Sequence, residues 1–358
     1  MEILLDRGDF GRIGRNVPEM ILSRTPLRIS LAGGSSDMKS FYSTRGGAVV
    51  SFAINKYVHI AVNEKFDGKT RVSYAETETV DDVKDLKHDI ARETLRYYAL
   101  SGLEISSLSD IPGSGTGLGS SSSYAVGLSA AITSYLNNGP CASPMLLARG
   151  AYHIERDRCG HPVGMQDQCA AAWGGLHCFT FRPDDTIGVQ PIFLDFEKKK
   201  YLEDHLMLFY TGITRDASPI LQSQDHNMRY RESAVEIGCK MRDLAFSLWG
   251  ELQEGNFRVI GDCLSEGWAL KQQITEGIGS LEISEFYNRA MNAGARGGKL
   301  CGAGGGGFLL FWVNQSRQDA VRRAIGLREM PIKIDLFGSK IVYGVYDGRK
   351  EEIENVVC

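Results

Sequence analysis

The chain has 358 residues, 43% of them hydrophobic and 23% charged, and its formal net charge at pH 7 is −4. This length allows two domains with cores of their own, and the composition is that of an ordinary soluble globular protein. The slightly negative charge provides no overall field for nucleic acid, so we expect no nucleic-acid partner and expect any anionic ligand to be held locally.

Cysteine usage and hydropathy narrow the class of protein further. The eight cysteines form no Cys-x-x-Cys pair, which disfavours a zinc site or a disulfide framework and favours reduced thiols in a cytoplasmic protein. No apolar run approaches the roughly 18 residues of a membrane span, so we expect no membrane partner. Residues 1–20 lack the apolar core of a signal peptide, and we interpret them as a loose N-terminal extension, with Met20 as an alternative start.

The first half of the chain alternates predicted strands and helices. Apolar alternation predicts a strand over 21–32, in which Pro26 restricts the first half to an edge or entry position. Further periodic segments predict a strand pair over 47–63 turning at Asn55–Lys56, a strand over 71–74, helices over 82–101, 120–136 and 143–158, and a strand over 176–181.

The charge run Phe196–Lys200 follows a completed α/β unit, and we place the boundary between the two domains there, after residue 197. Beyond it the pattern predicts a strand over 206–210, helices over 218–250, 256–273 and 284–292, a strand over 308–313, a helix over 315–325, and strands over 332–337 and 340–346 that close the second domain.

The most informative stretch is 111–123, Ile-Pro-Gly-Ser-Gly-Thr-Gly-Leu-Gly-Ser-Ser-Ser-Ser, which leads directly into an apolar helical pattern. Glycines let a ligand approach the main chain closely, and a helix starting at the serines would direct its free N–H groups and positive dipole end into the loop. This arrangement suits a phosphate chain, and the serine hydroxyls add donors and metal ligands. A flexible linker is the alternative, but a linker requires neither Pro112 nor the immediate apolar periodicity.

Comparison with common phosphate-binding motifs excludes several of them. A Walker A loop requires a lysine after the glycines, and none follows here. Leu118 stands where the dinucleotide-binding fingerprint has its third glycine, and the His-Arg-Asp and Asp-Phe-Gly landmarks of protein kinases are missing.

Three carboxylates near glycine turns are candidates for metal, base or substrate roles. Asp37 follows Gly33–Gly34 at the end of the first strand, where ligand hydroxyls could bind; a solvated turn is the alternative. Glu155 and Asp167 bracket the Gly/Pro turn at 159–164. A lone carboxylate is usually a solvated surface residue, but a pair in a chain with a phosphate loop favours metal and base roles.

Three motifs in this order resemble those of the GHMP kinases, the small-molecule kinases for galactose, homoserine, mevalonate and phosphomevalonate. They are Arg24–Asp37, Pro112–Ser121 and Lys299–Gly307. The resemblance covers nearly the whole chain from residue 21. It implies an α+β fold of two domains with the site between them: an α/β domain of the ribosomal protein S5 domain 2-like type over 21–197 and a ferredoxin-like α+β domain over 198–358.

Within that family, Gly-Gly-Ser-Ser-Asp at 33–37, in place of the Gly-Glu-His-x-Asp of galactokinases, is most similar to kinases of D-glycero-D-manno-heptose 7-phosphate and to the kinase half of fucokinases. The expected function is therefore ATP-dependent phosphorylation of the anomeric hydroxyl of that heptose phosphate to the 1,7-bisphosphate. The alternatives are a kinase for L-fucose or another free sugar, and a catalytically silent sugar sensor. We also leave a homodimer open.

The resemblance further implies roles for single residues. Asp167 matches the family's catalytic aspartate and Arg28 the cation that faces it, while Ser121 and Glu155 would hold Mg²⁺, with Ser120 as the alternative ligand. The implied ATP-binding residues are Pro112, Gly113, Ser114, Gly115, Gly117, Leu118, Gly119, Ser120, Ser121 and Ser122, and the implied sugar-binding residues are Gly34, Ser35, Asp37, Gly304, Gly305 and Gly306. Candidates for a basic pocket that holds a second phosphate are Lys39, Arg45, Lys69, Arg71, Arg158 and Arg215.

Overall fold

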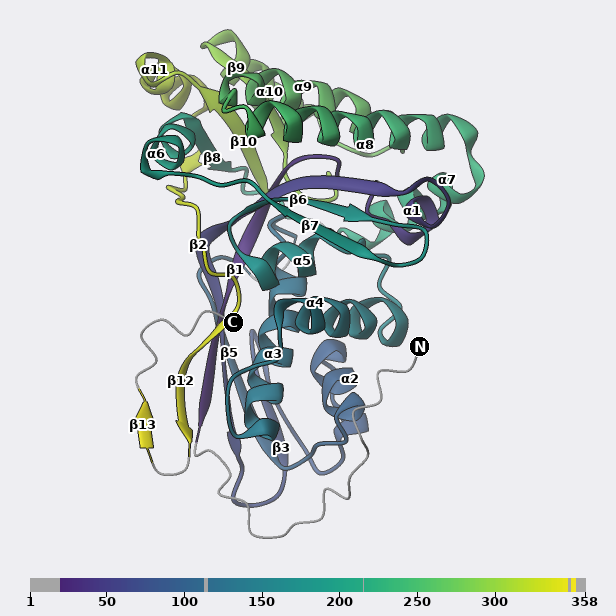
Figure 1. Cartoon of the computed structure of the whole chain (residues 1–358), viewed down its shortest axis with the longest axis vertical. Coiled ribbons are helices and arrows are strands. Elements are labelled where there is room, and N and C mark those ends of the chain that lie inside the picture. Colours follow the sequence, from purple (N-terminus) through teal and green to yellow (C-terminus); the bar gives the residue numbers. More distant parts are fainter. Residues whose placement is uncertain (1–19, 113–114, 215, 347–348, 352–358) are drawn as a thin grey trace.

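The computed structural model describes residues 20–112, 115–214, 216–346 and 349–351, which form two sheets with helices packed against them (Figure 1). The strands of the larger sheet are β1 (Ile21–Ala32), β2 (Gly47–Glu64), β3 (Thr70–Ser73), β4 (Thr77–Val80), β5 (Leu103–Ser109), β6 (Leu176–Phe181), β7 (Ile187–Pro191), β12 (Lys340–Tyr346) and β13 (Arg349–Glu351). Those of the smaller sheet are β8 (Leu206–Tyr210), β9 (Ala295–Leu300), β10 (Phe308–Val313) and β11 (Arg328–Glu329).

The helices are α1 (Lys39–Arg45), α2 (Asp89–Tyr97), α3 (Ser120–Asn137), α4 (Pro144–Tyr152), α5 (Gln166–Trp173), α6 (Phe196–His205), α7 (Ser218–Tyr230), α8 (Glu232–Gln253), α9 (Ile260–Lys271), α10 (Leu281–Asn292) and α11 (Gln315–Ile325). Short 3₁₀ turns lie at Val83–Asp85 and Phe257–Val259, and a π-helical turn at His153–Arg158 extends α4.

The larger sheet follows the path β13-β12-β1-β2-β5-β3-β4, with β6 paired to β2 and β7 to β6, and the smaller sheet has the order β11-β8-β10-β9. Helices α3 and α5 pack on β1 and β2, and α8 and α9 from the second half of the chain also contact β1. One hydrophobic core therefore joins residues from both halves, while a second core lies between the smaller sheet and α10 and α11.

The strand pair expected over 47–63 is instead one long strand, β2. Its register with β1 changes at Pro26, which is opposite Tyr57, whereas Leu27 is opposite Ile54, so Asn55 and Lys56 form a bulge rather than a turn. Proline has no N–H to donate to the ladder, and an irregularity at that point keeps the rest of both strands paired.

The strand expected over 340–346 forms, but it lies in the larger sheet instead of closing the second domain. Strand β12 pairs antiparallel with the first residues of β1, Ile21 being opposite Gly344. Over 332–337 the described structure shows only an isolated bridge between Ile54 and Ile334. The unpaired edge at the start of β1 is thereby covered, as exposed sheet edges usually are.

Several helices differ in length from their predictions. The segment 82–101 contains a short 3₁₀ turn and then α2, and the segment 218–250 is two helices separated at Arg231, whose backbone is extended. The charge run at 196–200 begins α6, and the Asp195 side chain accepts a hydrogen bond from the Lys198 N–H at 2.8 Å. An N-cap of this kind starts a helix even in a polar segment.

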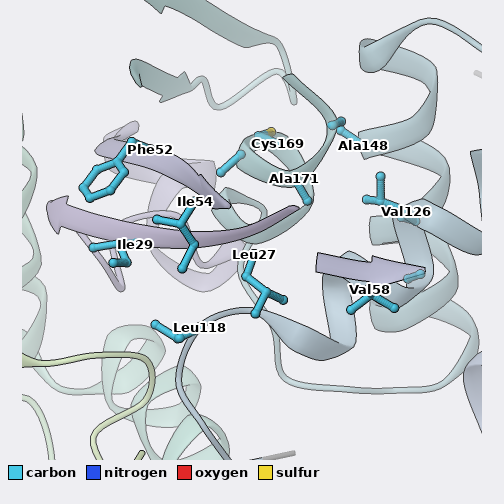
Figure 2. Packing of buried hydrophobic residues seen from close by; sticks show 14 of the residues in the cluster. Leu27, Ile29, Phe52, Ile54, Val58, Leu118, Val126, Ala148, Cys169 and Ala171 are labelled. Atoms are coloured by element: carbon cyan, nitrogen blue, oxygen red, sulfur yellow. The ribbon is translucent and has the colours of Figure 1, made fainter. Parts of the chain in front are cut away.

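The glycine loop before α3 is fixed to β1 by packing and by the main chain. Figure 2 shows Leu118 in this loop together with Leu27 and Ile29 of β1, and all three belong to the main core. The Arg28 N–H also donates to the Leu118 carbonyl at 3.1 Å. Leu118, expected to contact ATP, is thus a fully buried anchor of the loop.

Candidate active site

A cavity of about 520 Å³ opens where three parts of the chain meet: β1, the start of α3, and the glycine-rich loop that follows β9 within the motif Lys299–Gly307. This last segment is called the second glycine-rich loop below. The size of the cavity is within the usual range for a small-molecule site. Fourteen of the residues expected to act in the site line it: Arg28, Gly34, Ser35, Asp37, Gly115, Gly117, Gly119, Ser120, Ser121, Ser122, Asp167, Gly304, Gly305 and Gly306. Glu155 is buried beneath Ser121, Pro112 is exposed outside the lining, and Gly113 and Ser114 lie outside the described residues.

A bidentate ion pair occupies one wall of the cavity. From β1, Arg28 donates through Nε and Nη2 to the two carboxylate oxygens of Asp167 at 2.7 and 2.6 Å, and through Nη1 to the Gly117 carbonyl at 2.7 Å. Burial lowers the pKa of Arg28, but the charge of Asp167 and its hydrogen bonds, together with smaller effects of Cys301 and Asp37, leave the pKa raised. The guanidinium is therefore charged, and it orients the carboxylate toward the first turn of α3.

Asp37 lies at the base of the cavity and is almost fully buried. Its carboxylate accepts hydrogen bonds from the Ser35 N–H at 3.0 Å and from the main chain and side chain of Gln166 at 3.1 and 3.0 Å. Burial, and then the charge of Asp167, raise the pKa of Asp37 to about 6. A Cβ at position 164 would lie 2.0 Å from the Asp37 carboxylate, so only glycine fits there.

The first turn of α3 faces a buried carboxylate. Gly119, with φ +76°, caps the helix in the left-handed conformation that glycine adopts without strain. The Ser121 hydroxyl donates to Glu155 at 3.0 Å, and Gln168 donates to the other oxygen of Glu155 at 2.6 Å. Burial raises the pKa of Glu155, and no described Lys or Arg side chain forms an ion pair with it.

These oxygens fit a magnesium ion. A buried carboxylate without a cationic partner, with a hydroxyl beside it, presents the few hard oxygen ligands that Mg²⁺ takes while retaining waters. The described residues contain no group of three or more His, Cys, Asp or Glu side chains that could form an all-protein metal site. The candidate ligands are therefore Ser121 and Glu155.

The two glycine-rich loops pack main chain against main chain. A Cβ at Gly117 would lie 2.4 Å from the Cys301 carbonyl oxygen, and one at Gly302 would lie 2.2 Å from the Gly117 Cα. One at Gly307 would lie 2.1 Å from the Thr116 carbonyl oxygen. The loop at 299–307 therefore supports the loop at 115–119 in addition to lining the cavity.

The five described basic residues proposed for a second phosphate do not line the cavity. Four are paired elsewhere: Lys39 with Asp185, Lys69 with Asp81, Arg71 with Glu104 and Arg158 with Glu93. Arg45 lines a separate groove, and Arg215 lies outside the described residues. The sequence shows that these residues are charged but not which of their elements faces the cavity.

Among the polar lining residues that the sequence analysis did not single out, four contribute amide or ammonium groups to the cavity. They are Gln166, Gln224, Lys271 and Lys299. Gln224 accepts a hydrogen bond from the Ser35 hydroxyl at 3.3 Å and donates one to the Ala303 carbonyl at 3.2 Å. It therefore links the turn after β1 to the second glycine-rich loop. Only Gln166, beside Asp167, and Lys299, at the start of the third motif, had a sequence signal that could have drawn attention to them.

Comparison with known proteins identifies the family of the chain. The family models described as GHMP kinases N terminal domain and GHMP kinases C terminal match residues 85–175 and 250–331. The D-glycero-alpha-D-manno-heptose 7-phosphate kinase of Campylobacter jejuni is 30% identical over 318 residues, which are 85% of this chain and 93% of that protein. The galactokinase of Pyrococcus furiosus is 26% identical over 92% of this chain and 98% of its own.

Among solved structures, a D-glycero-D-manno-heptose 1-phosphate kinase from Bacteroides thetaiotaomicron superposes with a TM-score of 0.72 at 26% identity, covering 89% of this chain and 97% of that one. The two-domain α+β fold expected from the sequence is thus confirmed. No helix of the described residues is long and apolar enough to cross a membrane. The chain belongs to the GHMP kinases, ATP-dependent phosphotransferases whose acceptor is an alcohol.

Proposed function

We propose that this GHMP sugar kinase phosphorylates the anomeric hydroxyl of D-glycero-D-manno-heptose 7-phosphate and releases the 1,7-bisphosphate and ADP. The observation that carries the proposal is the Arg28–Asp167 pair in a cavity bounded by both glycine-rich loops. The names of the Campylobacter jejuni and Bacteroides thetaiotaomicron relatives support a heptose phosphate as the substrate class.

Phosphoryl transfer depends mainly on positioning and charge neutralisation, because the transition state is loose and its charge spreads over the transferred oxygens. The N–H groups of the first glycine loop and the N-terminus of α3 hold the triphosphate of ATP at one side of the cavity. Ser121 and Glu155 would hold Mg²⁺, which supplies positive charge to the phosphate oxygens when bound.

Asp167 accepts the proton of the anomeric hydroxyl as that oxygen attacks the γ-phosphorus and the bond to the ADP oxygen breaks. Arg28 fixes the orientation of both carboxylate oxygens, and its hydrogen bond to the Gly117 carbonyl couples this position to the phosphate loop. The guanidinium also places positive charge beside the migrating phosphoryl group.

An ADP-release assay over a panel of sugars tests the proposal. Purified enzyme with ATP and Mg²⁺ is given the heptose 7-phosphate, the unphosphorylated heptose, L-fucose and D-galactose. The heptose 7-phosphate is expected to have the highest kcat/KM. Strong turnover of L-fucose with none of the heptose phosphate would overturn the assignment, and binding of ATP and sugar without turnover at any Mg²⁺ concentration would indicate a sensor.

A further inference from the structure

Two lysines from the second half of the chain extend into the same cavity. Lys271 ends α9 and is 7% exposed, and Lys299 lies in β9 and is 9% exposed. The Lys271 ammonium donates to the Gly302 carbonyl, and the Lys299 ammonium donates to the Ser30 carbonyl at 2.9 Å. Both side chains thus bring a buried positive charge to the lining of the cavity.

The protein does not neutralise these two charges. Within the described residues neither ammonium forms an ion pair, and the partner of each is a neutral main-chain carbonyl. The charge of Arg28 is met by Asp167, which leaves Asp37 as the one other buried carboxylate on the lining, because Asp216 is exposed. Two ammonium groups therefore face one further carboxylate, so this part of the lining has a net positive charge.

The pKa values of both lysines are lowered, as expected where positive charges exceed the negative ones. Burial, and then the charge of Lys299, lower the pKa of Lys271 to about 7. Burial likewise lowers the pKa of Lys299. A buried cation whose charge is disfavoured by its surroundings is stabilised by an anionic partner. Each ammonium also has three N–H donors and uses one of them on the carbonyl described above, so donors remain for an anion.

The position of the lysines relative to Asp167 defines where that anion would lie. Arg28 and Ser30 are two residues apart on the same face of β1, which separates them by roughly 7 Å. Asp167 is bound to Arg28, and the Lys299 ammonium is bound to the Ser30 carbonyl. The ammonium groups and the Arg28–Asp167 pair thus line the same cavity, and a sugar whose hydroxyl meets Asp167 would also come within reach of the ammonium groups.

We propose that Lys271 and Lys299 bind the phosphate that the sugar substrate already carries. This inference rests on the proposed function, because it assigns the two lysines to a phosphate monoester on the sugar. An ATP γ-phosphate offers the same chemistry, but the first glycine loop and the α3 N-terminus already provide N–H donors for the triphosphate.

The test compares Lys299→Met and Lys271→Met with wild type and with Lys198→Met, an exposed lysine on α6 that serves as the matched control. Steady-state kinetics are measured with the heptose 7-phosphate, the unphosphorylated heptose and ATP. Each cavity variant is expected to lose about 10- to 100-fold in kcat/KM for the phosphorylated sugar, the scale of a lost charge-assisted hydrogen bond. Values for the free heptose and the KM for ATP are expected to change less than about threefold.

Two results would overturn the inference: an equal loss with both sugars, which indicates a structural role, or a rise in the KM for ATP alone, which assigns the lysines to the γ-phosphate. Inorganic phosphate is also tested on wild type, so that the inference does not depend on the variants folding. It is expected to compete with the heptose 7-phosphate and not with ATP, and lack of that competition counts against the site. Wild-type turnover of free sugars only would instead refute the proposed function.

Discussion

A carboxylate that receives two hydrogen bonds from one guanidinium has a fixed orientation, and Asp167 is held in this way by Arg28. Asp167→Asn keeps the shape of the side chain but removes the proton acceptor. We expect kcat to fall at least about 100-fold, the usual scale for a positioned base, while ATP affinity stays nearly unchanged. Steady-state kinetics and ATP titration calorimetry measure both quantities, with the exposed Asp319→Asn as control; near-normal kcat would refute the assignment.

A single residue, Asp37, also leads to a prediction about how the activity depends on pH. Its raised pKa, about 6, means that the carboxylate is ionised above pH 6 and increasingly protonated below it. Protonation weakens its hold on Gln166 and removes a negative charge from the cavity near Arg28 and Lys271. We therefore expect kcat/KM for the sugar to decrease below pH 6 with the slope of one proton.

A pH–rate profile from pH 5 to 8 checks this expectation, and Asp37→Asn should lack the acidic limb. A flat wild-type profile, or an unchanged limb in the variant, would contradict the role given to Asp37. The acidic limb is diagnostic because Lys271 has a pKa of about 7 and loses charge on the alkaline side instead.

At the scale of elements, the contact between the glycine loops is the feature most sensitive to substitution. Gly302 and Gly326 have similar positive φ angles, +73° and +67°, but only Gly302 has main-chain atoms within 3 Å of an added Cβ. Gly326→Ala should cost about 1–2 kcal/mol of unfolding free energy from the backbone conformation alone. Gly302→Ala should cost more and also raise the KM for ATP at least about tenfold, because it displaces Gly117.

Chemical denaturation and ATP kinetics on the two variants separate backbone strain from loop contact. If Gly302→Ala resembles Gly326→Ala in both measurements, the second loop does not support the first. The pair is matched because each replaces a glycine in the left-handed region by the same residue.

Elements with a clear local signal were predictable. The helix at 315–325 and the strands at 21–32, 176–181, 206–210 and 308–313 have the bounds that their apolar periodicity predicts. The bulge at Asn55–Lys56 was not predictable, because its cause, Pro26, lies in the opposing strand. Local pattern gives no information about which strand a segment meets across the sheet.

The residues of the candidate site also fall into those that were predictable from sequence and those that were not. Asp167, Arg28 and the phosphate loop lie in motifs whose residue types indicate their chemistry, and the structure places them around one cavity. Lys271, in contrast, is one lysine at the end of an amphipathic helix, and only tertiary packing turns it into the cavity. Arg158 shows the opposite error: its charge suggested phosphate binding, but its side chain forms an ion pair with Glu93.

At the scale of the whole molecule, the two halves of the chain share one core. Residues of α8 and α9 belong to the same cluster as β1 and β2, and β12 returns to pair with β1. Because α8 and α9 complete the core against β1, we expect a single cooperative unfolding transition despite the two sheets.

Asp335 offers a specific test of that coupling, because it joins the returning segment to the larger sheet. Its side chain accepts from the Tyr57 hydroxyl at 2.7 Å and from the Phe337 N–H at 2.8 Å, and its carbonyl accepts from the Gly175 N–H at 2.7 Å. Asp335→Ala removes the acceptor of the part-buried Tyr57 hydroxyl and Phe337 N–H and of the buried Gly338 N–H, so we expect a loss of roughly 3 kcal/mol of unfolding free energy.

Urea unfolding followed by far-UV circular dichroism and by tryptophan fluorescence should show one coincident transition in wild type, displaced as a whole in Asp335→Ala. The exposed Asp319→Ala should change stability by no more than about 0.5 kcal/mol. Two separated transitions, or a variant that displaces only one of the two signals, would show that the halves unfold independently. Coincidence is expected because β1, at the centre of the shared core, contacts α3 on one side of the cavity and α9 on the other, so its unfolding would disrupt both.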